Sequence, residues 1–252
     1  MENEEWVTGK IKLSLGGVPL DLQMTVPAKP VKPQRMLPIY RQITDSFVGM
    51  SEQAIANAGG QISCRKGCAA CCRQAIPLAE IEAYQIAEAV EALPEPQRAE
   101  IKKRFDQAWR HFSEMNWFER LDNCINLSPI EREQVILEYF NEFVACPLLE
   151  NESCLIHEAR PLACREYLVT SPAENCRQLS PEKIQIVEHA VKTSDAVRKT
   201  TNSRNLDQSV NFVPLVLALE WVKRNADEFP EKTGEHWMAT FFTHLTKSGI
   251  PG

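Results

Sequence analysis

The sequence has no apolar run long enough to cross a membrane. Runs such as FVPLVLAL at 212–219 are far shorter than the roughly 20 residues that a transmembrane helix needs. The N-terminus, MENEEW, is acidic and lacks the basic and apolar regions of a secretory signal. We therefore expect no membrane partner and a cytoplasmic location, where disulfides are uncommon and clustered cysteines more often bind metal or act as catalytic thiols.

A basic stripe and a glycine-rich nucleotide loop are also missing. The formal net charge is −6, which argues against nucleic acid as a partner. Without a G-x-G-x-x-G sequence, a Rossmann-type nucleotide site is not expected. The apolar content of 44% and charged content of 25% are ordinary for a globular protein. A chain of 252 residues also buries enough surface to fold without disulfides.

The N-terminal part of the chain predicts a β-hairpin. Apolar and polar residues alternate through residues 6–26 on both sides of Gly16-Gly17, and a Gly-Gly pair suits a tight hairpin turn. Residues 27–38 contain four prolines and read as a linker.

Most of the remaining chain predicts amphipathic helices, because apolar residues recur at spacings of three and four. The predicted helices cover 39–58, 77–93, 95–115, 128–144, 181–199, 209–227 and 235–247. Ser128 before Pro129 is a typical helix start, and the stretch between 146 and 181 is expected to be rich in loops. The fold class is mainly α, a helical body with an N-terminal β-hairpin and a cysteine-rich metal lobe built from loops. The expected organisation is 1–38 for hairpin and linker, 39–180 for a cysteine-cluster domain, and 181–252 for C-terminal helices packing on that domain.

Eight of the nine cysteines fall into two groups. The first group, spaced C-x3-C-x2-C-C, contains Cys64, Cys68, Cys71 and Cys72. The second group contains Cys146, Cys154, Cys164 and Cys176. Neither group follows a helical or strand periodicity, so these residues do not simply fill a core. Cys124 stands apart beside apolar residues and suits a small buried hydrophobe.

Disulfides, reactive thiols and metal ligation are the three interpretations of the eight cysteines. The expected compartment and the size of the core argue against disulfides. A reactive site needs one or two thiols, whereas soft thiolates from several loops bind zinc or iron–sulfur clusters. We therefore expect both loops to converge on metal. Adjacent side chains point apart, so Cys71 and Cys72 serve either a larger cluster or two sites, or one of them stays free.

Two arginines and a histidine accompany the second group. Arg160 and Arg165 flank Pro161 and Cys164, and guanidinium groups there would offset the negative charge of a thiolate-bound metal. The alternative is that both are ordinary surface charges. His157 follows Cys154 at a spacing of three, and we interpret it as a hydrogen-bonded neighbour of the site in preference to a ligand.

These residues resemble a known family. CRKGCAACC, followed by Cys146-Pro147, Cys154 and ARPLACR, is similar to the YkgJ-type cysteine-cluster family of zinc- or iron-chelating domains over roughly residues 60–176. His157 departs from the family pattern, which usually has an aromatic residue there. The resemblance implies binding of a metal ion or an iron–sulfur cluster. A related branch, the flagellin lysine-N-methylases, implies methyl transfer from S-adenosylmethionine.

The spacing C-x3-C-x2-C also resembles the radical S-adenosylmethionine signature, but long predicted helices follow Cys72 where that family has repeating strand–helix units. We predict a metal-binding protein that holds zinc or an iron–sulfur cluster. The alternative is an iron–sulfur-dependent enzyme for methyl or electron transfer, with S-adenosylmethionine as a further ligand. A structural site is coordinatively closed and a catalytic site keeps an open position, and the sequence leaves this choice open.

Overall fold

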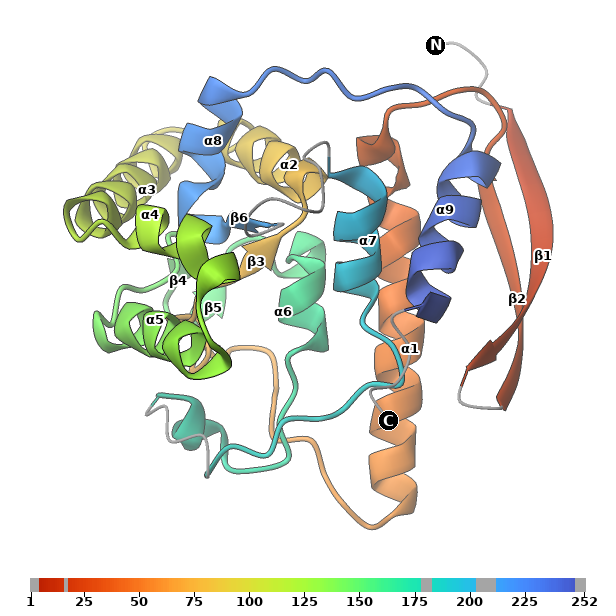
Figure 1. Cartoon of the computed structure of the whole chain (residues 1–252), viewed down its shortest axis with the longest axis horizontal. Helices are drawn as coiled ribbons and strands as arrows, with labels where there is room; N and C mark the ends of the chain where they lie inside the picture. Colours follow the sequence, from red (N-terminus) through yellow and green to blue (C-terminus); the bar gives the residue numbers. More distant parts are fainter. Residues whose placement is uncertain (1–4, 16–17, 178–182, 203–211, 248–252) are drawn as a thin grey trace.

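The computed structural model describes residues 5–15, 18–177, 183–202 and 212–247. As the sequence predicts, the fold is mainly α-helical with an N-terminal β-hairpin (Figure 1). Within the described residues, no helix combines the length and apolarity that crossing a membrane would require.

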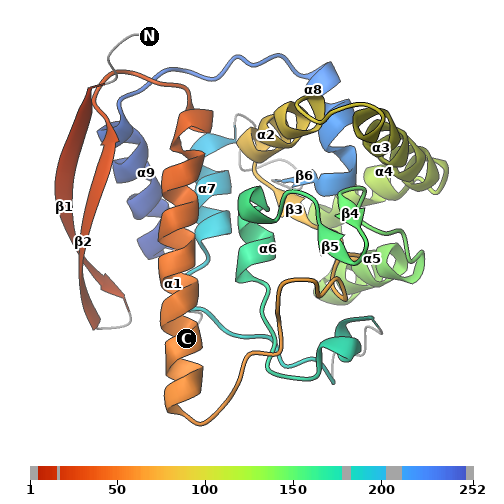
Figure 2. The same ribbon diagram turned by 180° about the vertical axis from the view of Figure 1, so that it is seen from behind.

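The hairpin consists of β1 (Trp6–Leu15) and β2 (Val18–Pro27) in antiparallel register. Ile11 faces Leu22 and Leu13 faces Leu20, so the apolar residues of both strands share one face. That face packs on a core shared with α1, α7 and α9 (Figures 1 and 2). The predicted hairpin is confirmed, while its Gly16-Gly17 turn lies outside the described residues.

The other elements follow in chain order. The helices are η1 (Pro33–Met36), α1 (Leu37–Asn57), α2 (Glu80–Glu91), α3 (Gln97–Glu114), α4 (Trp117–Asp122), η2 (Asn123–Asn126), α5 (Pro129–Asn141), η3 (His157–Ala159), α6 (Leu162–Glu166), η4 (Ala173–Arg177), α7 (Thr193–Thr201), η6 (Leu215–Leu217), α8 (Ala218–Arg224) and α9 (Gly234–Lys247). The short strands are β3 (Pro77–Leu78), β4 (Leu149–Glu150), β5 (Ser153–Cys154) and β6 (Val213–Pro214).

Local signals explain where the best-predicted helices begin and end. The Ser128 hydroxyl accepts a hydrogen bond from the Glu131 backbone N–H at 3.3 Å, and the Glu131 carboxylate accepts one from the Ser128 N–H at 2.8 Å. This capping box starts α5. Gly59 follows the end of α1 with a φ of +79°, a left-handed conformation that glycine adopts without strain.

The helix predicted over 181–199 is wrong in its first half. The described residues 184–192 form no helix, and Ile186 pairs with Val169 in an isolated bridge. Helix α7 begins only at Thr193, where the buried Glu166 carboxylate accepts hydrogen bonds from the Thr193 hydroxyl at 2.6 Å and the Ser194 N–H at 3.1 Å. A carboxylate at a helix N-terminus satisfies free backbone donors, so the start of α7 is set by a residue distant in sequence.

The helix predicted over 209–227 is also shorter than expected. Val213–Pro214 forms β6, which pairs antiparallel with β3, and α8 begins only at Ala218. Residues 209–211 of the prediction lie outside the described residues. The pairing of β6 with β3 brings the segment before α8 against the segment that follows the first cysteine group.

The apolar core is divided between the two sides of the molecule. One cluster joins the hairpin, α1, α7 and α9, and it also takes Leu162 from α6. Another joins α2, α3 and α8 and has Cys146 packed against it. The division of the chain at residues 38 and 180 stays a prediction, since both clusters mix residues from more than one of the three predicted segments.

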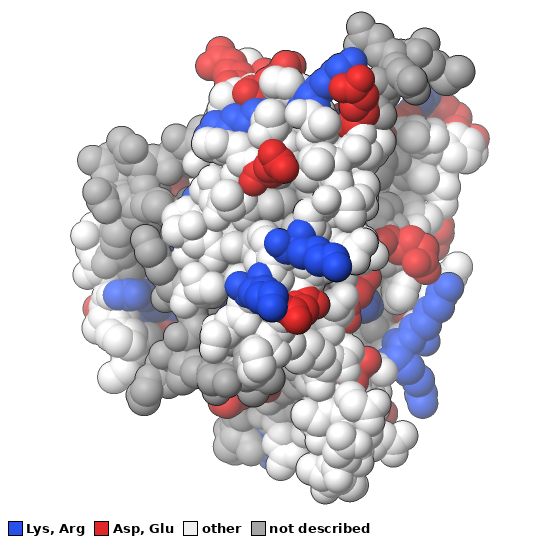
Figure 3. Space-filling view, turned by 90° about the vertical axis from the view of Figure 1, so that its right-hand side faces the viewer, with Lys and Arg blue, Asp and Glu red and all other residues white. Residues whose placement is uncertain are grey.

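The face of the molecule on the hairpin side carries charges of both signs. Basic and acidic side chains are interspersed there, and the described residues form no continuous patch of one sign on this face (Figure 3).

Candidate metal centre

The first cysteine loop connects α1 to β3 through a series of tight turns. The Cys68 N–H donates to the Arg65 carbonyl at 3.0 Å, and the Cys72 N–H donates to the Ala69 carbonyl at 3.0 Å. Gly67 has a φ of +83°, which a residue with a Cβ adopts only with strain. The turns reverse the chain at short intervals, so the cysteines are not spread along one extended segment.

The second loop carries its cysteines on short elements. Cys146 precedes a turn, Cys154 ends β5, Cys164 lies within α6 and Cys176 lies within η4. Sequence periodicity missed α6, which has only five residues and is too short for a repeating apolar pattern.

The two loops lie side by side. The Cys146 N–H donates to the Cys72 carbonyl at 2.7 Å, and the Ser63 N–H donates to the Val169 carbonyl at 2.9 Å. The Val169 N–H donates to the Cys64 sulfur at 3.4 Å. In Figures 1 and 2 the segment after α1 runs beside the segment that follows α6. These contacts link both ends of the first cysteine group to the second loop.

The structure rearranges the two sequence groups. Cys176 packs in a small apolar cluster with Ala70 and Val169, and against this cluster lie Cys64, Cys68 and Cys71. Cys176 therefore joins the first group in space, although it is the most distant from that group in sequence. Cys72 is joined to Cys146 through the backbone, which places it toward the second loop.

Cys71 lies at the centre of the arrangement. Ionisation of its thiol would raise the pKa of five other cysteines, from both loops, so it lies within electrostatic range of all of them. They are Cys64, Cys146, Cys154, Cys164 and Cys176. Cys71 also forms a side-chain hydrogen bond with Cys72, and this bond together with burial raises its own pKa strongly.

Burial keeps most of these thiols protonated in the metal-free protein. It raises the pKa of Cys146 to about 12 and that of Cys176 to about 11, and it places the pKa of Cys164 well above its usual value. Neighbouring thiolates add to the effect in each case. Without a bound cation, these buried thiols stay protonated and are therefore weak nucleophiles. A cation bound among them would lower their pKa values and favour the thiolate form.

Arg160 is the cation that the structure brings to the cysteines. Its positive charge acts to lower the pKa of Cys64, Cys71 and Cys154. Burial, and for Cys71 hydrogen bonding, acts in the opposite direction and is stronger, so each of the three pKa values is raised overall. Its Nε is buried and has no hydrogen-bond partner within the described part of the chain. Its Nη1 lies 3.3 Å from the Nε2 of His157, which agrees with the interpretation of His157 as a hydrogen-bonded neighbour.

Arg165 has a different set of contacts. This buried guanidinium donates to both carboxylate oxygens of Asp45 in α1, at 2.7 and 2.8 Å, and to the Arg160 carbonyl at 3.2 Å. It also donates to the Glu158 carbonyl. Arg165 thus ties the loop that carries Arg160 to helix α1, a positioning contact that the sequence did not predict.

Replacing Asp45 with Asn should weaken this tie. Loss of a charged hydrogen-bonded pair to a buried arginine is expected to lower the free energy of unfolding by about 1–2 kcal/mol, allowing for the exposure of Asp45. Urea unfolding of the variant measures the loss. Asp106→Asn is the matched control, because the Arg110–Asp106 pair is exposed on both sides and should cost less than about 0.5 kcal/mol. Equal losses in the two variants would show that Arg165 does not need Asp45.

Tyr167 also contacts the cysteines and was missed by the sequence analysis. Its hydroxyl hydrogen-bonds the Cys176 thiol and accepts a hydrogen bond from the Gln74 amide at 3.1 Å. A tyrosine three residues after Cys164 carries no motif of its own, so only the tertiary contact reveals it.

The ligand assignment stays a prediction. Among the described residues, no three His, Cys, Asp or Glu side chains are placed as one metal ion would require. The side chain of Cys124 lies outside the described residues, so its predicted place away from the centre is also open.

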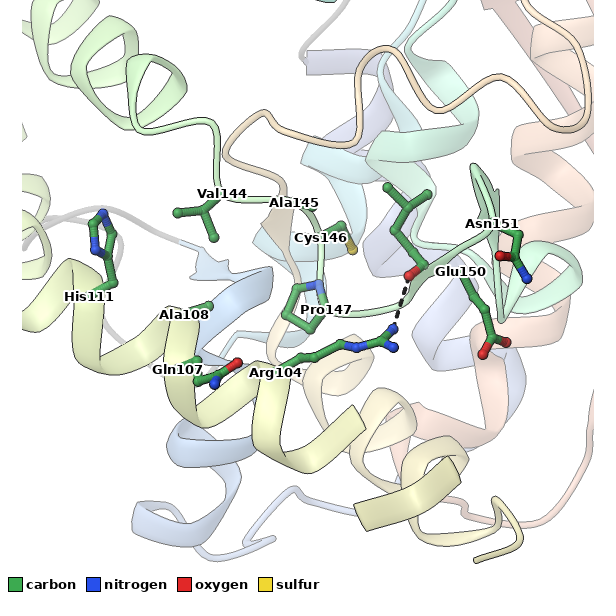
Figure 4. Close-up of a pocket in the computed structure, with 11 residues that line it drawn as sticks. Arg104, Gln107, Ala108, His111, Val144, Ala145, Cys146, Pro147, Glu150 and Asn151 are labelled. Carbon is green, nitrogen blue, oxygen red and sulfur yellow. Dashed lines mark hydrogen bonds between the residues drawn. The ribbon is translucent and has the colours of Figure 1, made fainter. Parts of the chain in front are cut away.

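A cavity of about 600 Å³ lies against Cys146 (Figure 4). Helix α3 lines one side with residues at helical spacing, and the segment around Cys146 lines the other. The lining residues are Arg104, Gln107, Ala108, His111, Val144, Ala145, Cys146, Pro147, Leu149, Glu150 and Asn151. Arg104 donates to the Leu149 carbonyl at 3.1 Å across the cavity. A molecule bound here would lie beside one of the candidate ligands.

Comparison with known proteins gives one match. The family model CxxCxxCC, described as "Putative zinc- or iron-chelating domain", matches residues 63–191, which is slightly more than half of the 252 residues. Searches of curated proteins and of solved structures each gave no match.

Proposed function

Because the chain belongs to the CxxCxxCC family of zinc- or iron-chelating domains, we propose that its eight clustered cysteines hold zinc or an iron–sulfur cluster. The family resemblance seen in the sequence is confirmed, and with it the metal-binding character of the domain. The observation that carries the finer proposal is the contact between the two cysteine loops: the Cys146 N–H donates to the Cys72 carbonyl at 2.7 Å, and Cys176 packs in the same cluster as Cys64 and Cys71.

The residues present suit such a group. Thiolates are the preferred ligands of zinc and of iron–sulfur clusters, and a thiolate-bound centre carries negative charge. The buried Arg160 Nε lacks a hydrogen-bond partner within the described residues. A thiolate sulfur of the bound centre would be an acceptor for its N–H. Bound metal would supply the positive charge that keeps the buried thiols ionised.

We further propose that the centre has two adjoining parts. Cys64, Cys68, Cys71 and Cys176 would form one part, supported by their common packing. Cys72, Cys146, Cys154 and Cys164 would form the other, supported by the Cys72–Cys146 backbone bond and the mutual effects of the remaining thiols. This division assigns the adjacent Cys71 and Cys72, whose side chains hydrogen-bond each other, to the two parts at their junction.

Metal analysis with an absorption spectrum of anaerobically purified protein tests the proposal. We expect at least one equivalent of metal per chain. A colourless protein containing zinc would identify zinc sites, and a brown protein containing iron and sulfide would identify a cluster. Protein that is folded and holds no metal after incubation with either zinc or iron and sulfide would contradict the proposal.

The second candidate is an iron–sulfur-dependent enzyme that acts by methyl or electron transfer. It is favoured by the cavity beside Cys146, whose volume of about 600 Å³ is within the range of small-molecule sites. For methyl transfer, S-adenosylmethionine would occupy this cavity. Calorimetry with S-adenosylhomocysteine tests this, with Gln107→Trp as a variant that obstructs the cavity from an exposed position. Absence of binding by the metal-loaded wild type would remove the methyl-transfer candidate.

A further inference from the structure

A second opening reaches the other end of the cysteine group. It has a volume of about 600 Å³ and is lined by Cys64 and Cys68 together with residues of the first loop and of η4. Cys64 and Cys68 are partly exposed, as are the other candidate ligands except the buried Cys176. This opening is therefore a direct route from solvent to two of the proposed ligands.

The charge around this opening is opposite in sign to that of the whole chain. Its lining contains Arg65 and Arg177 against the single acidic residue Glu174, and Lys66 follows Arg65 directly in the chain. The chain as a whole has a formal net charge of −6. A local excess of positive charge on an acidic protein concentrates anions at that site.

Most of this positive charge is not neutralised by ion pairs. Arg65 and Lys66 are exposed, and within the described residues neither side chain has a hydrogen bond or an ion pair. Arg177 pairs with Glu152 at 2.8 Å, and Arg73 lies 3.6 Å from the same carboxylate. One glutamate thus serves two arginines, and the rim keeps a net positive charge.

The cavity beside Cys146 differs in this respect. Its Arg104 pairs with Glu100 at 3.0 Å, and its lining also contains the acidic residue Glu150. Charges there are balanced by near neighbours, so that cavity has no comparable attraction for anions.

We propose that metal enters and leaves through the opening at Cys64 and Cys68, and that its carrier is an anionic carboxylate chelate drawn by Arg65 and Lys66. This rests on the proposed metal-binding function. On delivery, metal–sulfur bonds form as the thiols release their protons to solvent, and the metal–carboxylate bonds break. The freed carboxylate chelator then departs; because a single Zn²⁺ or Fe²⁺ ion keeps its oxidation state in this exchange of ligands, no oxidant or reductant is needed.

Extraction of bound metal tests the route, because a chelator that removes metal follows the same path in reverse. EDTA is the anionic probe and 1,10-phenanthroline is the neutral probe. The variant is Arg65→Glu/Lys66→Glu. The control is Lys10→Glu/Lys12→Glu, which makes the same change in net charge at exposed positions of β1, on the other side of α1 from η4 (Figure 2).

At low ionic strength, Arg65→Glu/Lys66→Glu should slow extraction by EDTA about tenfold, and 0.5 M salt should reduce the difference to less than about twofold. For the same variant, the rate of extraction by phenanthroline should differ from the wild-type rate by less than about twofold. For the Lys10→Glu/Lys12→Glu control, the rates with EDTA and with phenanthroline should both stay within about twofold of wild type. Unchanged EDTA rates, equal slowing in the control, or equal slowing with phenanthroline would each overturn the route. A wild-type protein without metal would instead refute the proposed function itself.

Discussion

Replacing Cys71 with Ser is expected to remove nearly all metal from the chain, to less than about a tenth of the wild-type content. Cys71 is the residue whose charge would act on cysteines of both loops. A serine hydroxyl is a hard, weakly acidic ligand and replaces a soft thiolate poorly. Because the two proposed parts adjoin at the Cys71–Cys72 peptide, loss of Cys71 as a ligand should disturb both parts, and not one part alone. Metal analysis after anaerobic purification measures the effect.

Cys124→Ser is the matched control, with the same chemical change at a cysteine predicted to stand outside the centre. It should keep the wild-type metal content and cost at most about 1 kcal/mol of free energy of unfolding. Equal metal loss in both variants would mean that the grouping of the cysteines is wrong. Full metal content in the Cys71 variant would mean that Cys71 is not a ligand.

Metal binding should strengthen steeply as the pH rises from 6 to 8. Burial raises the pKa of Cys146 to about 12 and that of Cys176 to about 11, so these thiols are protonated throughout this range without metal. Each thiol that becomes a ligand must release a proton. A site with four thiolates should therefore gain up to about four orders of magnitude in zinc affinity per pH unit.

Calorimetric titration of zinc in buffers of different ionisation enthalpy measures the protons released, and we expect about four for each zinc bound by a four-sulfur site. Protein alkylated at its thiols is the control and should bind no zinc. Release of less than one proton would contradict the assignment of buried thiols as ligands.

The same pKa shifts predict that the metal-free protein loses stability in alkali. The folded-state pKa of each buried thiol lies above its unfolded value of about 8.5. As the pH rises past 8.5, the unfolded chain releases thiol protons that the folded chain retains, so the free energy of unfolding falls. Urea unfolding of metal-free protein between pH 7 and 10 should show this decline, and metal-loaded protein should show much less. A metal-free protein that is equally stable at both ends of this range would contradict the burial of these thiols.

The sequence correctly predicted those helices and strands whose formation depends on interactions between residues close together in the chain. The alternation across β1 and β2 and the capping box at Ser128 each depend on neighbours within a few residues. The predictions were wrong where distant contacts decide. Residues 183–192 carry a helical pattern, but Ile186 pairs with Val169 and the Glu166 carboxylate starts α7 at Thr193.

The candidate site shows the same division. The spacing separated the eight cysteines from Cys124. It could not reveal that Cys176 packs beside Cys64, because the two residues are roughly a hundred positions apart and only the tertiary structure brings them together. Arg160 and Arg165 are equivalent in sequence, each close to Cys164. Only the tertiary contacts distinguish Arg160, whose charge acts on the thiols, from Arg165, which is bound to Asp45.

X-ray absorption spectroscopy at the metal edge tests the central claim most directly, because it counts the ligand atoms that surround the bound metal. For zinc-loaded protein we predict four sulfur ligands at about 2.3 Å and no nitrogen or oxygen in the same shell. For iron-loaded protein we predict a first shell of sulfur alone. A first shell dominated by nitrogen or oxygen at about 2.0–2.1 Å would contradict the cysteine-built metal centre.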